Sequence, residues 1–253
     1  FAIWSAKIRY LGVGAMLIGG VWTLFSLRKS LLSGIRSGFA AARKNTGEAV
    51  AETDRDLPMK WMLVALVLFV IPLAFLYQAI VNQWLVAIPM TIIMIVAGFL
   101  FVSVSGYLAG LVGSSNNPVS GITIATILFA SVVLVLLLGR DSDKGAVAAI
   151  MIGAVVCCAA AVGGDNLQDL KAGYLVGATP WKQQLMLAIG AFSCALIMAP
   201  VLNLLAAAYG IGAPTPEHPN SLSAPQATLM GSVGKGMFGG KLPWGMIAIG
   251  VGV

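Results

Sequence analysis

The feature that most constrains this chain is its series of long apolar runs, separated by short polar segments. A membrane-spanning helix needs about 20 consecutive, mostly apolar residues, and six runs come near or exceed that length. The chain is 59% hydrophobic and only 9% charged, so a soluble fold would leave large apolar patches in water. We therefore predict an all-α, polytopic integral membrane protein, with broken or re-entrant polar segments between its spans. The six predicted spans cover residues 10–27, 60–81, 84–111, 118–138, 146–162 and 180–208, and a truncated seventh begins near Trp244.

The two ends of the sequence lead us to expect a fragment. The chain begins with Phe1 and ends within an apolar stretch that starts at Trp244. We treat residues 1–253 as a single transmembrane domain, expected to be part of a larger membrane protein.

Basic residues gather in the segment 28–59, which indicates how the chain is oriented. Cytoplasmic loops carry an excess of Lys and Arg, so this segment is predicted to be a basic cytoplasmic loop of a multi-pass protein in the cell (inner) membrane. Residues 30–42 fit either an amphipathic helix on the membrane surface or a solvated linker. Alternation then places 140–144 and the long polar loop 212–242 outside, and the segment 171–182 inside. The net charge of +6 reports this orientation, and we expect no nucleic-acid partner. The basic residues are Arg28, Lys29, Arg36, Arg43, Lys44 and Arg55.

The polar stretch GSSNNPVSG, residues 113–121, interrupts two apolar runs. Asn117 fits the N-cap of the following helix and Pro118 its first position. The free N–H groups and positive end of that helix would then point into the loop. At membrane depth this is the chemistry of a substrate site in a transporter with broken helices, whereas at the surface it is an ordinary turn. The candidate substrate-binding residues of the stretch are Ser114, Ser115, Asn116, Asn117 and Ser120.

Tyr107 is a further substrate-binding candidate on the preceding predicted helix. It shares a helical face with Ser103, Gly106 and Gly110. Gly106 and Gly110 form a GxxxG pair, which usually packs helices together. The face therefore serves either helix packing or, through the Tyr107 hydroxyl, the substrate pathway.

A second polar stretch covers residues 164–184. Asp165 fits the N-cap of a short helix that ends at Gly173, and Thr179 with Pro180 fits the start of the next span. On that helix Asp165, Gln168 and Asp169 share a face. Acids near membrane depth are candidates for proton or cation coupling, although an interfacial helix with solvated acids explains them equally well. The candidate coupling or gating residues are Asp165, Gln168, Asp169 and Lys171.

A third polar stretch, residues 221–244, is predicted to contain a short amphipathic or re-entrant helix that starts after Ala224. One side of it is apolar. His218 has no second ligand at metal spacing, and the three Cys lie in apolar runs, where they are small packing residues. We therefore predict neither a metal site nor a cofactor. The apolar side consists of Leu229, Met230, Val233, Met237 and Phe238.

These three stretches together resemble the oligopeptide transporter (OPT) family, which includes the yellow stripe-like metal-chelate transporters of plants. The likeness is carried by GLVGSSNNPVSGITIATIL (110–128), GGDNLQDLKAGYLVGATPWKQQ (163–184), APQATLM (224–230) and FGGKLPW (238–244). The form of these motifs is most similar to the prokaryotic branch. The signature motifs of the eukaryotic peptide carriers are not found, and the plant metal-chelate members differ at SSNNP.

The resemblance implies a helical secondary transporter of roughly sixteen spans, of which this chain would match part of the second half. Such proteins carry small peptides or metal–chelate complexes, typically by proton symport. The expected partners are the lipid bilayer, the peptide or metal-chelate substrate and the coupling proton, with a homo-oligomer left open.

A mechanism follows as a hypothesis. The carboxylate of a peptide would bind at the helix start near Asn117 to Ser120, and Ser114, Ser115 and Asn116 would bind backbone amides. The ammonium group or the proton would bind Asp165, Asp169 or an acid in the absent half of the protein. A channel and a membrane-embedded enzyme remain alternatives, but two acids one turn apart on one helix cannot easily bracket a substrate bond, so we expect no enzyme.

Overall fold

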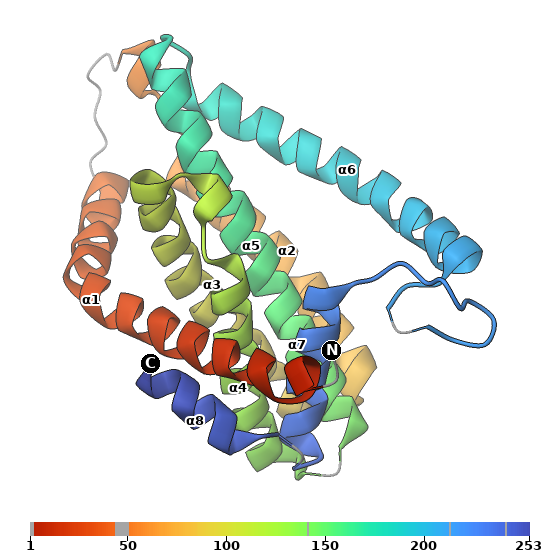
Figure 1. Ribbon diagram of the computed structural model, residues 1–253. Helices are drawn as coiled ribbons and strands as arrows, with labels where there is room; N and C mark the ends of the chain where they lie inside the picture. The colour runs from red at the N-terminus through yellow and green to blue at the C-terminus, as the bar shows by residue number, and fades with distance from the viewer. Residues whose placement is uncertain (1–2, 44–50, 141, 213, 241) are drawn as a thin grey trace.

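The computed structural model describes residues 3–43, 51–140, 142–212, 214–240 and 242–253 (Figure 1). The described residues are almost entirely helical, and their only strand-like pairing is a single bridge between Ile211 and Leu222. Helices α1 to α6 each include a stretch long and apolar enough to cross a membrane, which confirms the all-α polytopic prediction. The α-helices are α1 (Arg9–Arg43), α2 (Met59–Val81), α3 (Trp84–Val112), α4 (Val119–Leu138), α5 (Asp143–Leu175), α6 (Pro180–Tyr209), α7 (Pro225–Phe238) and α8 (Trp244–Gly252). Three short elements are η1 (Trp4–Ile8), η2 (Glu52–Asp54) and η3 (Ser114–Asn116).

The bundle is built around α4. This helix packs against α1, α3, α5 and α7, and 61% of its apolar stretch is buried. The buried face of α4 also carries hydroxyl groups. Thr123 and Thr126 donate hydrogen bonds to the carbonyls of Val119 and Ile122, one turn earlier (2.7 and 2.8 Å). These bonds satisfy the two threonine hydroxyls within their own helix, whereas the buried Ser131 hydroxyl of α4 has no partner among the described residues.

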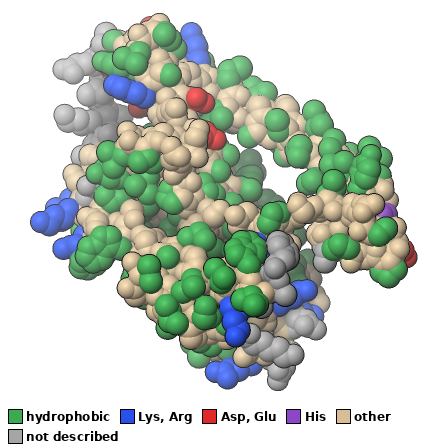
Figure 2. Space-filling view, in the orientation of Figure 1, with side chains coloured by type: hydrophobic (Ala, Val, Ile, Leu, Met, Phe, Trp, Pro, Cys, Tyr) green, Lys and Arg blue, Asp and Glu red, His purple; other side chains and the backbone are tan. Residues whose placement is uncertain are grey.

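Helix α6 is the opposite case, since none of its residues is buried. Figure 1 shows it leaving the upper end of α5 and projecting away from the bundle. Many of its side chains are apolar and exposed, and Figure 2 shows apolar side chains over much of this face, with a few charged ones among them and at its margins. Such a surface is matched to lipid or to other apolar helices rather than to water.

Helix α1 corrects the prediction of a basic loop at 28–59. The helix continues through Arg43, so residues 30–42 are helical and do not form a linker. The absence of Pro between residues 9 and 43 allows this continuation. The location of this segment on the cytoplasmic membrane surface stays a prediction. Residues 44–50 of the predicted loop lie outside the described residues.

Helix α5 corrects a second prediction. The span expected at 146–162 and the short helix expected from Asp165 to Gly173 form one continuous helix, so Asp165 is an interior residue and not a cap. The helix ends instead at Leu175, and the chain turns two residues later at Gly177, whose φ of +77° is a left-handed conformation that favours glycine. There Ala178 N–H donates to Gly173 O (2.8 Å) and Gly177 N–H to Tyr174 O (3.3 Å), the paired bonds of a Schellman motif.

Helix α7 confirms the short amphipathic helix predicted in the third polar stretch. It begins at Pro225, directly after Ala224, and buries Leu229, Val233 and Phe238. It packs against α4 and α5, so the segment 212–242 is a loop only in part; residues 213 and 241 lie outside the described residues. Helix α8 begins at Trp244, where the seventh span was expected to begin.

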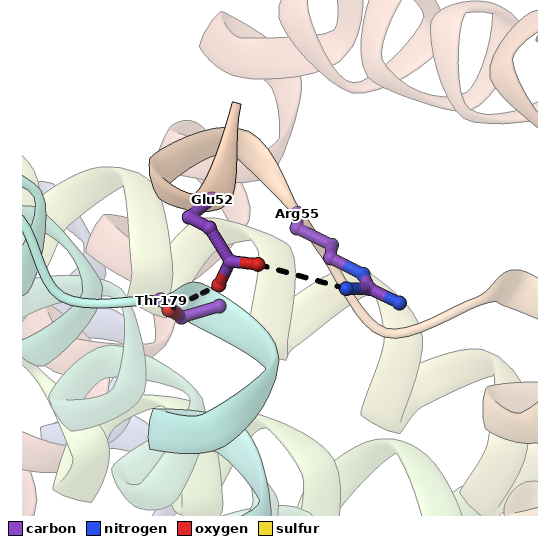
Figure 3. Close-up of polar contacts among 3 residues, drawn as sticks. All are labelled: Glu52, Arg55 and Thr179. Atoms are coloured by element: carbon purple, nitrogen blue, oxygen red, sulfur yellow. Dashed lines mark hydrogen bonds and ion pairs between the residues drawn. The ribbon is translucent and has the colours of Figure 1, made fainter. Parts of the chain in front are cut away.

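The segment before α2 meets the α5–α6 turn at one end of the bundle (Figure 3). Thr179 Oγ1 donates to a Glu52 carboxylate oxygen (3.3 Å), and the other oxygen lies 3.7 Å from the Arg55 guanidinium. Trp181 N–H, at the start of α6, donates to Arg55 O (3.2 Å). As predicted, Thr179 occupies the N-cap position of α6 and Pro180 its first turn, but the Thr179 side chain makes no capping hydrogen bond to its own helix.

The crossing of α1 and α8 gives the first prediction. A Cβ on Gly14 would lie 2.1 Å from the Ile247 carbonyl oxygen, whereas a Cβ on Gly19 would meet nothing within 4 Å. We expect Gly14→Ala to destabilise the protein by about 1–3 kcal/mol, the range for overpacking against atoms that cannot move aside. Thermal unfolding in detergent, with Gly19→Ala as the matched control, measures this. Equal unfolding midpoints for the two variants would show that the α1–α8 contact is not tight.

Candidate functional site

The loop between α3 and α4 contains the predicted substrate residues. Helix α3 ends at Gly113, which has a φ of +82°, and the turn η3 follows. Helix α4 begins at Val119, so Pro118 occupies the N-cap position and not the first helical position. The predicted cap role of Asn117 is therefore wrong, and the reason is that its side chain is engaged elsewhere.

The Asn117 side chain turns back toward α3 and α5. Its Nδ2 donates to Ser105 Oγ (2.5 Å), and Ser105 Oγ in turn donates to the backbone carbonyl of Ala160 on α5. Ser105 is fully buried. This chain of hydrogen bonds joins the loop, α3 and α5 at one point.

Gly164 on α5 leaves the space in which Asn117 sits. A Cβ on Gly164 would lie 2.5 Å from Asn117 Nδ2 and 3.0 Å from Ser105 Oγ. Its neighbour Gly163 faces a different partner, because a Cβ there would lie 2.6 Å from Val102 Cγ1 on α3. The two glycines thus have separate functions: Gly163 allows the helices to approach, and Gly164 accommodates the loop.

A second contact fastens the loop to α5 one turn further along. Ser114 N–H donates to Gln168 Oε1 (2.8 Å). Asn116 instead bonds within its own turn, because its Nδ2 donates to Val112 O (3.1 Å) and so satisfies a carbonyl at the end of α3. The structure therefore brings Ser114 and Asn117 together with Gln168, which the sequence had placed in two separate groups.

A cavity of about 320 Å³ lies on the other side of the loop, between α1, α3 and the start of α4. None of its described lining residues is charged. Ser120 and Gly121 are the second and third residues of α4, and no hydrogen bond joins their N–H groups to another described residue. The lining includes Thr23, Val104, Leu108, Asn117, Ser120 and Gly121.

The other predicted residues lie outside this cavity. Ser115 and Asn116 are exposed, and so is Tyr107, at 45% of its surface. Gly106, beside Tyr107, is a packing residue, since a Cβ there would lie 2.2 Å from Leu167 of α5.

The predicted coupling residues lie in the C-terminal part of α5. Asp165, Asp169 and Lys171 are exposed. The Lys171 ammonium lies 5.3 Å from the centre of the Tyr174 ring. Among the described residues no group of His, Cys, Asp and Glu side chains is arranged to hold a metal ion.

The sequence reasoning missed three contributors to the site. Ser105 is a single hydroxyl within an apolar span and gives no signal of its own. Gly164 lies between the predicted end of a span at residue 162 and the predicted cap at Asp165, so its place inside one continuous helix was not foreseen. The face of α1 that contributes Thr23 became visible only once the helices were packed.

The fold and this site define a polytopic helical membrane protein with a polar loop clamped between its helices. All 253 residues match the family model of the OPT oligopeptide transporter protein, residues 1–253, and the chain belongs to this family. It is 39% identical, over 271 aligned residues, to a Haemophilus influenzae protein that is provisionally named an oligopeptide transporter. The alignment covers 99% of this chain and 43% of that relative, so the chain spans less than half of its length. No solved structure matches the chain.

The contact between Gly164 and Asn117 gives the second prediction. We expect Gly164→Ala to lower stability by about 1–3 kcal/mol, because the new methyl group displaces the carboxamide. In an Asn117→Ala background most of that cost should disappear, since the displaced group is gone, and a double-mutant cycle of unfolding midpoints measures the difference.

Gly163→Ala is the matched control for this cycle. Its methyl group collides with Val102, so its cost should be the same in both backgrounds. If the stability cost of Gly164→Ala were also the same in both backgrounds, the proposed fit between Gly164 and Asn117 would be disproved.

Proposed function

We propose that the chain forms part of a proton-coupled symporter of small oligopeptides in the inner cell membrane, and that the cavity at the start of α4 is part of its substrate path. Family membership supports transport in general. The observation that carries the proposal is the cavity itself, which combines neutral polar groups with apolar walls beside the first turn of a helix.

The first turn of α4 suits the carboxylate of a peptide. The N–H groups of Ser120 and Gly121 have no partner among the described residues, and both residues line the cavity. The N-terminal end of a helix carries a partial positive charge, so free N–H groups there favour an anion. Val104 and Leu108 supply apolar wall that accepts side chains of different kinds.

The loop lies at the membrane boundary if α4 spans the hydrocarbon layer. The helix has 20 residues, which gives a length of about 30 Å, equal to the thickness of that layer. Helix α5 continues past the loop to Leu175. Asp165 and Asp169 thus lie beside the loop and just beyond it, where a proton from the aqueous phase reaches them.

The coupling step is assigned to these two acids. Both are exposed on the segment of α5 that holds the loop through Gln168. A change in their charge acts on the same helix turn that binds Ser114 N–H. Proton binding and loop position are thereby linked through one short stretch of α5.

Transport by the full-length protein in proteoliposomes tests the proposal. We expect di- to tetrapeptides to accumulate against their gradient when the lumen is alkaline relative to the bath, and accumulation to be abolished by a protonophore. Ferric chelates are tested in parallel. Accumulation of chelates but not peptides would reassign the substrate, and equilibration without accumulation would indicate a channel.

The acids give a separate prediction. We expect Asp165→Asn and Asp169→Asn, singly or together, to reduce proton-driven accumulation at least tenfold while peptide exchange across the membrane continues. Exchange does not need net proton movement, so it reports an intact substrate site. Glu217→Gln, which changes an exposed acid far along the chain, is the control. Full accumulation in the double variant would place the coupling site elsewhere.

A further inference from the structure

We infer that Asn117 presents its carbonyl oxygen, and not its N–H group, to the transported peptide, and that Ser105 and Gly164 are positioning residues that fix this orientation. The inference rests on the proposed peptide transport. It predicts that the peptide group recognised by Asn117 is a hydrogen-bond donor, an amide N–H or the terminal ammonium.

The direction of the hydrogen bonds is set from α5. The Ala160 carbonyl can only accept a hydrogen bond, so Ser105, which is bonded to it, donates its single proton there. The Ser105 oxygen is then an acceptor, and the group that meets it must be a donor. The Asn117 carboxamide therefore turns its Nδ2 toward Ser105, and this network assigns its orientation.

Burial prevents the donor and acceptor roles in this network from being exchanged. Ser105 is fully buried, so no water competes for its proton. Gly164 and Ala109 enclose the Nδ2 side, because a Cβ on Gly164 would lie 2.5 Å from Nδ2 and 3.6 Å from the Ala109 Cβ. One end of the carboxamide is thus committed to the protein.

The other end of the carboxamide has no partner. Asn117 Oδ1 is buried and accepts no hydrogen bond from the described residues. A buried acceptor without a partner is unfavourable, and Asn117 lines the cavity. A donor on the substrate removes this penalty, whereas a carboxylate brought to Oδ1 would be repelled. The carboxylate is therefore recognised at the first turn of α4, and Asn117 recognises a different group of the same peptide.

Peptide analogues test this assignment directly. The probe is a tripeptide compared with analogues in which each amide N–H in turn is methylated and the terminal amine is acetylated. In the wild-type full-length protein we expect one of these changes to raise KM at least tenfold. In Asn117→Leu, whose KM is already raised, the same change should have little further effect. If each analogue raised KM by the same factor in the wild-type protein and in Asn117→Leu, Asn117 would not recognise a donor.

A second comparison concerns the positioning residues. Ser105→Ala frees the carboxamide to turn, so we expect KM to rise about tenfold with kcat within twofold. Ser131→Ala is the matched control, because Ser131 is also fully buried on a helix and its hydroxyl has no partner among the described residues. Equal kinetics for the two variants would overturn the role of Ser105.

A readout that does not depend on transport separates this inference from the proposed function. Ser115 is exposed in the same loop, so Ser115→Cys, in protein whose native cysteines are replaced, reports loop position through its rate of maleimide labelling. We expect the rate to rise at least threefold with Ser105→Ala or Gly164→Ala and to stay unchanged with Ser131→Ala. An unchanged rate in all variants would disprove the positioning role even if peptides are transported. Absence of peptide transport, with the rate raised as expected, would instead overturn the proposed function.

Discussion

The structure depends on one constraint: inside a bilayer, every backbone N–H and C=O must find a partner within the protein. Long helices satisfy it everywhere except at their ends, and the α3–α4 loop, which we propose lies at the membrane boundary, joins two such ends. The protein meets the constraint there with side chains, since Asn116 bonds a free carbonyl of α3 and Gln168 accepts from a loop N–H. Among the described residues, the N–H groups of Ser120 and Gly121 and the Oδ1 atom of Asn117 remain without a partner, and all three residues line one cavity.

Glycines decide how closely these parts approach. On α5, two adjacent glycines face different neighbours, one the helix α3 and the other the carboxamide of the loop. A glycine inside a helix is intrinsically unfavourable, and in this helix the close packing that it permits offsets that cost. Glycines also allow close approach where α1 crosses α8, because the two backbones are in contact at Gly14 and Gly250. Lipid provides no hydrophobic driving force between apolar helices, so close packing at such crossings holds the bundle together.

The length of the apolar runs predicted the fold class and the existence of six long helices, because crossing a bilayer requires about 20 apolar residues. It did not predict that α1 and α5 continue well past their apolar stretches. Local signals also located Pro225 and Pro180 at helix starts. Those signals failed in two places: Asp165 was predicted to cap a new helix, whereas it lies inside α5, and Asn117 was predicted to cap α4, whereas Pro118 occupies that position. Asn117 cannot cap α4 because Ser105, twelve residues earlier in the chain, holds its side chain. A contact between helices is not encoded in the residues next to either partner, so no local pattern could have indicated it.

The position of α6 has a consequence for its apolar surface. None of its residues is buried, and at its N-terminal end Trp181 N–H donates to Arg55 O beside the contact of Thr179 with Glu52. Its other end leads through residues 210–224 into α7, which packs on α4 and α5. The helix is therefore joined to the bundle at both ends while its length is uncovered, and that length offers a continuous apolar surface to lipid or to other apolar helices.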